Sequence, residues 1–315
     1  MEHRNIGKSG LRVSALALGC SNLGVRIDFE TSRQVVDAAF NHGITFFDTA
    51  DAYGNRGGSE TVLGELLGAR RKEIVLASKF RHPMNDSGSL SGASRRYIMS
   101  AVEASLKRLK TDWIDLYQLH RPDPLTPIEE TMRGLDDLVR SGKVRYVGCS
   151  NLPAWQVVDA IWTSRHNGLH AFVSCQDQYN LMVRDAEREL IPAMQRHGLG
   201  LLPYFPLASG LLTGKYKPNA PPPEGTRLAK SAVFGGHLFL TQENLALTDR
   251  IRQFAEARGH SVLELACSWL LARPTVASVI VGVSKPEQLK QNVDAISWKL
   301  TAQELAEVDK LAART

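Results

Sequence analysis

The stretch "GITFFDTADAYG", Gly43 to Gly54, decides the fold because it places an apolar strand directly before ionisable side chains. Its apolar run, Ile44 to Phe47, is typical of a buried strand, and Asp48 stands where that run ends. Tyr53 follows five residues later, in a loop bounded by glycine. A buried strand that leads into a carboxylate and a phenol predicts a site at the carboxyl end of that strand.

Similar apolar runs recur along the chain and alternate with segments of helical periodicity. Strands that alternate with helices form a parallel sheet, and near-continuous apolar runs are typical of strands covered on both faces. Eight such units predict an α/β fold, a single (β/α)8 TIM barrel over residues 1–315, with a doubly wound open sheet as the alternative. The predicted strands are residues 13–19, 44–50, 73–79, 113–120, 144–150, 171–178, 199–205 and 277–283.

Three segments depart from this alternation. Residues 4–14 predict a hairpin that plugs the bottom of the barrel, and residues 207–242 predict a long loop on its C-terminal face, since they follow the seventh strand. The capping-box patterns "TPIE" (126–129), "SVLE" (261–264), "SKPE" (284–287) and "TAQE" (301–304) each predict the start of a helix. The last of these helices is additional to the barrel.

Composition excludes several classes of function. The chain has 315 residues, 43% hydrophobic and 23% charged, and no apolar run reaches the roughly 18 residues of a membrane span. The four cysteines show no Cys-x-x-Cys spacing and the N-terminus has no apolar signal segment, so we expect a cytoplasmic protein with reduced thiols. Basic residues are scattered, which argues against nucleic acid as a partner. His166 and His170 lack an adjacent Glu, so no metal site is expected, and nothing in the sequence indicates an oligomeric state.

Three consecutive predicted strands end in Asp48, Lys79 and His120. Each residue alone is more often structural than functional. Because neighbouring parallel strands lie about 4.8 Å apart, we expect the three side chains to meet at one mouth, with Tyr53 folded over them. A nearby ammonium lowers the pKa of a phenol, a carboxylate keeps the ammonium charged, and a histidine donates a hydrogen bond to a carbonyl oxygen. This combination predicts a site that polarises a carbonyl group and delivers a proton to its oxygen.

The motifs "GITFFDTADAYG", "LASKF", "LYQLHRPDP", "VGCSN" and "QDQYN" together resemble those of the aldo-keto reductase family, in particular its potassium-channel β-subunit-like branch of NADP-dependent oxidoreductases. They occur in the family's order, between about residues 13 and 293. The resemblance implies that Tyr53 is the general acid–base, that Lys79 and Asp48 tune it, and that His120 orients the substrate carbonyl. It also implies NADP(H) as cofactor, bound without a Rossmann domain.

The same resemblance implies which residues contact the cofactor. Ser150, Asn151 and Gln176 match groups that bind the nicotinamide carboxamide, and Tyr204 matches the aromatic residue that stacks on the nicotinamide ring. Phe205 is a departure, because the branch usually has serine there. The complete predicted set is Gly19, Cys20, Ser21, Asp48, Ser150, Asn151, Gln176, Tyr204, Phe205, Pro206, Leu207, Lys215, Arg227, Gly282, Ser284, Gln288, Gln291 and Asn292.

The adenosine phosphate end of this set centres on a predicted helix start. Ser284 is expected to cap that helix, whose free N–H groups would make an anion site. Lys215 and Arg227 would reach the pyrophosphate or the 2′-phosphate. Gly282 and Gln288 stand where many members carry Lys or Arg, so the preference for NADP over NAD rests on the remaining basic residues.

Three functions fit the sequence. The first is a reductase of a small-molecule carbonyl, or in reverse an alcohol dehydrogenase. The second is a lyase in which Lys79 forms a Schiff base. The third is a non-catalytic NADP-binding subunit that senses redox state. The presence of all four predicted catalytic residues argues against this third function. Aromatic residues in or beside the loops favour an apolar aldehyde or ketone, although Arg26 or Arg81 would suit an anionic one; these aromatic residues are Phe29, Phe80, Phe205, Phe234 and Phe239.

Overall fold

The computed structural model describes residues 1–216, 220, 222–224, 226, 228 and 239–313. Two residues singled out from the sequence, Arg227 and Phe234, lie outside the described residues. No helix among the described residues is long and apolar enough to cross a membrane.

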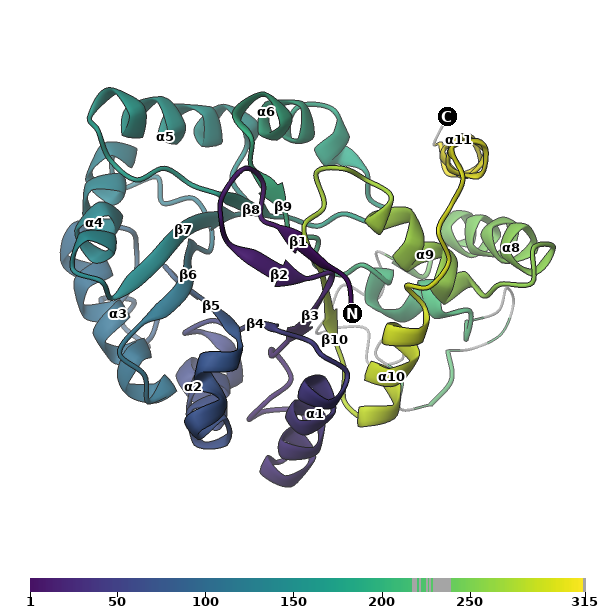
Figure 1. The fold of residues 1–315 in the computed structure, drawn as a ribbon, viewed down its shortest axis with the longest axis horizontal. Coiled ribbons are helices and arrows are strands. Elements are labelled where there is room, and N and C mark those ends of the chain that lie inside the picture. The colour runs from purple at the N-terminus through teal and green to yellow at the C-terminus, as the bar shows by residue number, and fades with distance from the viewer. Residues whose placement is uncertain (217–219, 221, 225, 227, 229–238, 314–315) are drawn as a thin grey trace.

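The eight predicted strands form one parallel sheet with the strand order β10-β3-β4-β5-β6-β7-β8-β9, and this sheet curls into a barrel (Figure 1). Leu201 bridges Val276, just before β10, and its N–H donates to the Thr275 carbonyl at 2.7 Å, so the two edges of the sheet meet. The (β/α)8 prediction is therefore confirmed, and the open sheet is wrong. The strands are β3 (Leu16–Gly19), β4 (Phe46–Asp48), β5 (Val75–Phe80), β6 (Ile114–Leu119), β7 (Val144–Ser150), β8 (Ser174–Gln176), β9 (Gly200–Leu201) and β10 (Val279–Gly282).

Helices follow the strands and cover the outside of the barrel (Figure 1). Each turns an apolar stripe inward; in α4, for example, Met132, Leu135 and Leu138 are buried, as a 3.6-residue period requires. The helices are α1 (Phe29–Asn41), α2 (Tyr53–Leu67), α3 (Arg95–Leu109), α4 (Ile128–Arg140), α5 (Ala154–His166), α6 (Leu190–His197), α8 (Gln242–Glu256), α9 (Val262–Leu271), α10 (Pro286–Asp294) and α11 (Ala302–Leu311), with short 3-10 turns η1 (Gly68–Glu73), η2 (Asp185–Glu187) and η3 (Ala208–Thr213).

The predicted N-terminal hairpin is present as antiparallel β1 (His3–Asn5) and β2 (Arg12–Ser14), which lie across the centre of the barrel in Figure 1. Its apolar side chains Ile6, Leu11 and Val13 pack against the residues that fill the barrel interior, among them Phe46 and Leu116. Burial of each such side chain contributes about 1.5–3 kcal/mol. The hairpin closes the N-terminal end, which leaves the C-terminal ends of the strands as the open mouth.

Two of the four capping boxes are confirmed. In α9, Ser261 and Glu264 each bond the other's backbone N–H, and α11 repeats this arrangement. The other two are wrong: α4 begins at Ile128 with Pro127 as its N-cap and no side-chain cap bond, and α10 begins at Pro286 with Lys285 as its N-cap. Ser284 instead donates from its backbone N–H and its hydroxyl to the Gln288 side-chain oxygen, at 2.9 and 3.2 Å. The predicted cap therefore lies one residue too early to serve the helix.

Candidate active site

Lys79 and Asp48 form a buried ion pair at the C-terminal end of the barrel. Asp48 ends β4, and Lys79 is the penultimate residue of the neighbouring strand β5. The Lys79 ammonium donates to Asp48 Oδ2 at 2.7 Å and to the Thr49 carbonyl at 2.9 Å. Lys79 has no exposed surface and Asp48 is 3% exposed. Strand register alone therefore brings these two charges into contact, as the sequence pattern predicts.

Tyr53 is brought to this pair by an unusual turn at the start of α2. The four residues from Gly54 to Gly57 all have positive φ, between 58 and 111°. At Gly54 a Cβ atom would lie 2.4 Å from the Ser59 backbone nitrogen, so only glycine fits there. The turn leaves the Tyr53 ring with its centroid 5.0 Å from the Lys79 Nζ atom. The glycines that bound the loop in the sequence thus position the phenol.

His120 completes the group from the end of β6. Its backbone N–H donates to the Phe80 carbonyl at 3.1 Å, and its ring meets the Tyr53 ring edge-on, with the centroids 5.6 Å apart. Its ring also lies nearly perpendicular to that of His82, a residue that the sequence analysis missed, with the centroids 4.5 Å apart. The structure therefore brings Tyr53, Lys79, Asp48 and His120 together at one mouth.

The protonation states follow from burial and charge. Burial lowers the pKa of Lys79, but Asp48 and Tyr53 outweigh it and raise that pKa above its ordinary value, so the amine is an ammonium. Burial raises the pKa of the Tyr53 phenol, and the opposing effect of Lys79 does not overcome it. The expected lowering of the Tyr53 pKa is therefore wrong in direction, because burial is the larger effect. The phenol keeps its proton at neutral pH.

His120 is neutral at this site. Burial, reinforced by Lys79 and His82, holds the pKa of the His120 imidazole well below its usual value. Its Nδ1 atom is buried and has no hydrogen-bond partner among the described residues. A neutral imidazole retains one N–H donor, which is the property that orientation of a carbonyl oxygen requires.

Asp48 is held by two amide side chains as well as by Lys79. Gln118 Nε2, on β6, donates to Asp48 Oδ1 at 3.3 Å, and Gln176 Nε2, on β8, donates to the same oxygen at 2.8 Å. Sequence reasoning missed Gln118, although a polar residue inside the apolar run "LYQLH", two positions before His120, was a usable signal for the same strand face. Gln176 is predicted to contact the cofactor, and its amide nitrogen also donates to Asp48.

A second hydrogen-bonded group lies beside the four catalytic candidates. The Tyr204 hydroxyl donates to Asn151 Oδ1 at 2.7 Å, and Asn151 Nδ2 donates to Ser150 Oγ at 2.9 Å and to the His120 carbonyl at 3.1 Å. Ser150 Oγ in turn donates to the Gln176 carbonyl at 2.7 Å. A partly exposed aromatic ring edged by amide and hydroxyl groups fits a flat heterocycle that carries a carboxamide.

Neighbouring cofactor candidates occupy the adjoining strand ends. Gly19 pairs with both Asp48 and Gly282, and the Cys20 N–H donates to the Asp48 carbonyl at 2.8 Å, while Ser21 follows in a turn. Cys20 itself is fully buried, and burial raises the pKa of its thiol. The end of β3 therefore lies between Asp48 at the end of β4 and Gly282 at the end of β10.

The segment after β9 contains three further candidates. Phe205 has a positive φ of 50°, and its carbonyl accepts a hydrogen bond from Asn180 Nδ2 at 2.9 Å. Pro206 is buried, and Leu207 packs partly buried against the core. Asp177, which was not predicted from the sequence, directly follows β8. Its Oδ2 atom is buried and has no hydrogen-bond partner among the described residues. Burial raises the pKa of Asp177 to about 8.

The remaining cofactor candidates are more exposed. Gly282 ends β10, and a Cβ atom there would have no neighbour within 4 Å. Ser284 and Gln288 form a hydrogen bond with one another at the start of α10. Gln291 is exposed, Asn292 is buried on the inner face of the same helix, and Lys215 is exposed with its Nζ atom 5.3 Å from the Tyr216 ring centroid.

An open pocket of about 670 Å³ lies beside Tyr53 and His120. The other residues that line it are Ala52, Asn55, Arg56, His82, Pro83 and Arg121. The predicted aromatic lining is absent from this set: Phe80 is fully buried and stacks on Tyr117, and Phe239 is 6% exposed. Phe80 and Phe239 serve the core, whereas Phe29 is 49% exposed and the Phe205 ring meets that of Tyr204 with the centroids 5.3 Å apart, so an apolar substrate stays a prediction.

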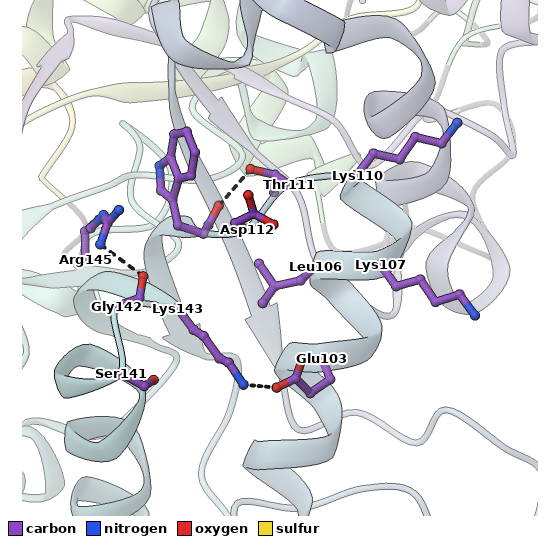
Figure 2. A pocket seen from close by; sticks show the side chains of 11 residues that line it. Glu103, Leu106, Lys107, Lys110, Thr111, Asp112, Ser141, Gly142, Lys143 and Arg145 are labelled. Carbon is purple, nitrogen blue, oxygen red and sulfur yellow. Dashed lines mark hydrogen bonds and ion pairs between the residues drawn. The ribbon is translucent and has the colours of Figure 1, made fainter.

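A pocket of about 700 Å³ lies at the opposite end of the barrel, where α3 ends and β6 and β7 begin (Figure 2). Lys143 pairs there with Glu103, and Arg145 donates to the Gly142 carbonyl. Lys107 and Lys110 stand in and after the last turn of α3, where cations complement a helix C-terminus. This basic pocket is explained by helix stabilisation and is remote from the strand ends that carry the candidate site.

Comparison with known proteins agrees with this geometry. A model of the aldo/keto reductase family matches residues 15–313. An uncharacterized oxidoreductase of Bacillus subtilis, YrpG, is 38% identical over 95% of this chain and 92% of its own length. A putative voltage-gated potassium channel subunit beta of Schizosaccharomyces pombe is 38% identical over 98% of this chain and 92% of its own. The L-glyceraldehyde 3-phosphate reductase of Escherichia coli K12 is 36% identical, with the same coverage.

Proposed function

Because the chain belongs to the aldo/keto reductase family, a family of oxidoreductases, we propose that it is an NADPH-dependent reductase of aldehydes or ketones. The observation that carries this proposal is the convergence of Tyr53, Lys79, Asp48 and His120 at one mouth, beside Tyr204 and its amide neighbours. The proposal treats residues 1–315 as one catalytic domain. A cytoplasmic location is part of it, supported by four cysteines that are all free thiols.

Each of the four side chains has a distinct task. Tyr53 holds a proton on its phenol oxygen and delivers it to the carbonyl oxygen of the substrate. The Lys79 ammonium stabilises the phenolate that remains, and Asp48 keeps Lys79 charged and in place. The neutral His120 donates a hydrogen bond that orients and polarises the carbonyl. The reverse sequence of proton movements would oxidise an alcohol.

The residues around Tyr204 would hold the nicotinamide end of NADP(H), and those around Ser284, with Lys215, the phosphate end. Bound there, NADPH would supply the hydride for the carbonyl carbon and leave as NADP⁺. Tyr204 would present its ring face, while Asn151 and Ser150 would offer amide and hydroxyl groups to the carboxamide. The preference for NADP(H) over NAD(H) is supported by the exposed cations Lys215 and Lys285 at the mouth.

The two rival functions fit less well. A Schiff-base lyase needs the Lys79 amine deprotonated, whereas its raised pKa and its two donor hydrogen bonds keep it an ammonium. A non-catalytic redox-sensing subunit is suggested by the channel-subunit names of some relatives, including one of Arabidopsis thaliana. A subunit of that kind has no need for a complete set of proton-transfer residues, which this site contains.

A cofactor titration followed by a carbonyl panel tests the proposal. Tryptophan fluorescence quenching should show tighter binding of NADPH than of NADH, and loss of NADPH absorbance should follow addition of an aldehyde or ketone. Binding of NADPH without turnover of any carbonyl compound would favour the non-catalytic subunit. Covalent trapping of a carbonyl compound on Lys79 by borohydride would favour the lyase.

A further inference from the structure

Three arginines lie at or near the pocket beside Tyr53, and two of them form no ion pair with a described residue. Arg121 lines it, and neither Arg121 nor the nearby Arg81 forms a side-chain hydrogen bond or ion pair with another described residue. The Nε atom of Arg81 is buried without a partner. The charges of both arginines reach the pocket, since both contribute to the low pKa values of His82 and His120. A third arginine, Arg56, pairs only with Asp86, which is 95% exposed.

The carboxylates near this pocket are committed elsewhere. Asp48 is held by Lys79 and by two amides. Asp123, whose charge Arg81 also influences, accepts from the Ala93 N–H at 2.7 Å, the Leu125 N–H at 3.2 Å and the Thr126 hydroxyl at 2.8 Å. These bonds fix the loop after β6; the Asp123 carboxylate offsets part of the Arg81 charge without pairing with it, and Arg121 pairs with no carboxylate among the described residues. The pocket therefore has a net positive charge.

The backbone at two of these arginines supports a binding role. Arg81 has a φ of 115° and Arg56 a φ of 66°, conformations that cost a non-glycine residue on the order of 1–3 kcal/mol. Neither side chain gains a buried protein partner in return. Strained backbone of this kind concentrates at active sites and ligand sites.

We propose that the substrate of this pocket is a carbonyl compound that carries an anionic group, a carboxylate or a phosphate. Arg121 and Arg81 bind that group, while the carbonyl oxygen faces Tyr53 and His120. A guanidinium matches both anions because its N–H groups form two parallel charge-assisted hydrogen bonds. The inference rests on the proposed reductase function and names the class of its substrate.

Two matched substrate pairs test the inference: butanal against succinic semialdehyde, and dihydroxyacetone against dihydroxyacetone phosphate. Within each pair the compounds share a carbonyl and differ in one anionic group. The wild type is expected to show a kcat/KM at least about tenfold higher for an anionic member, which corresponds to about 1.4 kcal/mol. Added salt should reduce this preference, because salt screens exposed charges.

Arg121→Gln and Arg81→Gln should each remove most of the preference, chiefly through a higher KM for the anionic compound. Near-ultraviolet circular dichroism and NADPH affinity like those of the wild type show that each variant is folded, and an effect on KM larger than that on kcat separates anion binding from proton transfer. Arg196→Gln is the matched control, because it makes the same charge change on an exposed residue in the last turn of α6, at the opposite end of the barrel. This control should retain the preference.

The outcomes separate the inference from the proposed function. A preference confined to one pair supports the inference and identifies carboxylate or phosphate as the bound group. Reduction of both members of each pair at similar kcat/KM, or equal effects of Arg121→Gln and Arg196→Gln, overturns the inference while the reductase function stands. A wild type that reduces none of the four compounds overturns both.

Discussion

The two ends of the candidate site are built differently. At the proposed proton-transfer end, Lys79 and Asp48 are almost wholly buried, and strand register and the amides of Gln118 and Gln176 hold them in place. At the proposed phosphate end, Ser284 is half-buried, Gln288 is exposed, and the two bond one another. Buried charges with several partners are expensive to disturb, whereas exposed polar groups exchange their partners with water at little cost. Effects of substitution should therefore decrease from the first end to the second.

Tyr53→Phe should have the largest effect. It removes the proton donor and leaves the ring, so kcat should fall on the order of 10³-fold while NADPH binds with unchanged affinity. Steady-state kinetics and fluorescence titration measure the two quantities. Tyr146→Phe, on β7 near the plugged end of the barrel, is the control and should retain activity. Near-normal turnover by Tyr53→Phe would remove the phenol from the mechanism.

Lys79→Met should combine loss of activity with loss of stability. It leaves the Asp48 carboxylate buried without a counter-ion, which costs about 3–5 kcal/mol of the free energy of unfolding. The double variant Asp48→Asn/Lys79→Met should recover most of that stability and remain inactive. Lys290→Met breaks an exposed ion pair with Asp294 and should cost at most about 1 kcal/mol. Urea unfolding measures the free energy of unfolding of the three variants. Equal losses of stability in Lys79→Met and Lys290→Met would contradict the expected difference between the buried and the exposed ion pair.

Asp51→Asn should stabilise the protein in a pH-dependent way. Asp51 is 1% exposed, neither of its oxygens has a well-formed partner among the described residues, and burial together with Glu60 raises its pKa to about 8. An unfolded aspartate has a pKa of about 3.9, so the folded state takes up a proton between the two values and loses stability as pH rises from about 4 to 8. The variant lacks this penalty.

Unfolding at several pH values measures this difference. Asp51→Asn and the wild type should be similar in stability near pH 4, and the variant should be more stable by on the order of 2 kcal/mol near pH 8. Asp159→Asn, on the exposed face of α5, should change stability little at any pH. A constant difference between Asp51→Asn and wild type across this range would show that Asp51 does not titrate as its burial indicates.

The buried end was the more predictable from sequence. Apolar runs gave the eight strands, and because parallel strands end at a common mouth, Asp48, Lys79 and His120 could be grouped without coordinates. The pKa of Tyr53 was not predictable in direction, since residue spacing shows which charges are near but not how much water a fold excludes. Gln118 was not predicted because it lies inside β6, and only polar residues at strand ends were taken as candidates.

The exposed end was less predictable because a short polar motif can adopt several backbone conformations with different hydrogen-bond partners. In "SKPE" the proline takes the first position of α10, so Lys285 becomes the N-cap and Ser284 turns to Gln288. The aromatic residues expected to line the substrate pocket show the same weakness, because loop position did not reveal that Phe80 and Phe239 turn into the core. Side chains whose direction depends on loop geometry need a structure.

Gln288→Lys should have the smallest effect and addresses the exposed end directly. It places an ammonium beside Ser284, where the 2′-phosphate would bind, and it gives up only the exposed hydrogen bonds between the two side chains. The ratio of NADPH to NADH affinity should rise about threefold, or about 0.6 kcal/mol, as exposed charge pairs typically contribute. Gln303→Lys, on the exposed face of α11, should leave the ratio unchanged. Fluorescence titration measures both affinities. If Gln288→Lys changes the NADPH and NADH affinities alike, the start of α10 does not bind the 2′-phosphate that distinguishes the two cofactors. The phosphate end of the site must then lie elsewhere along the mouth.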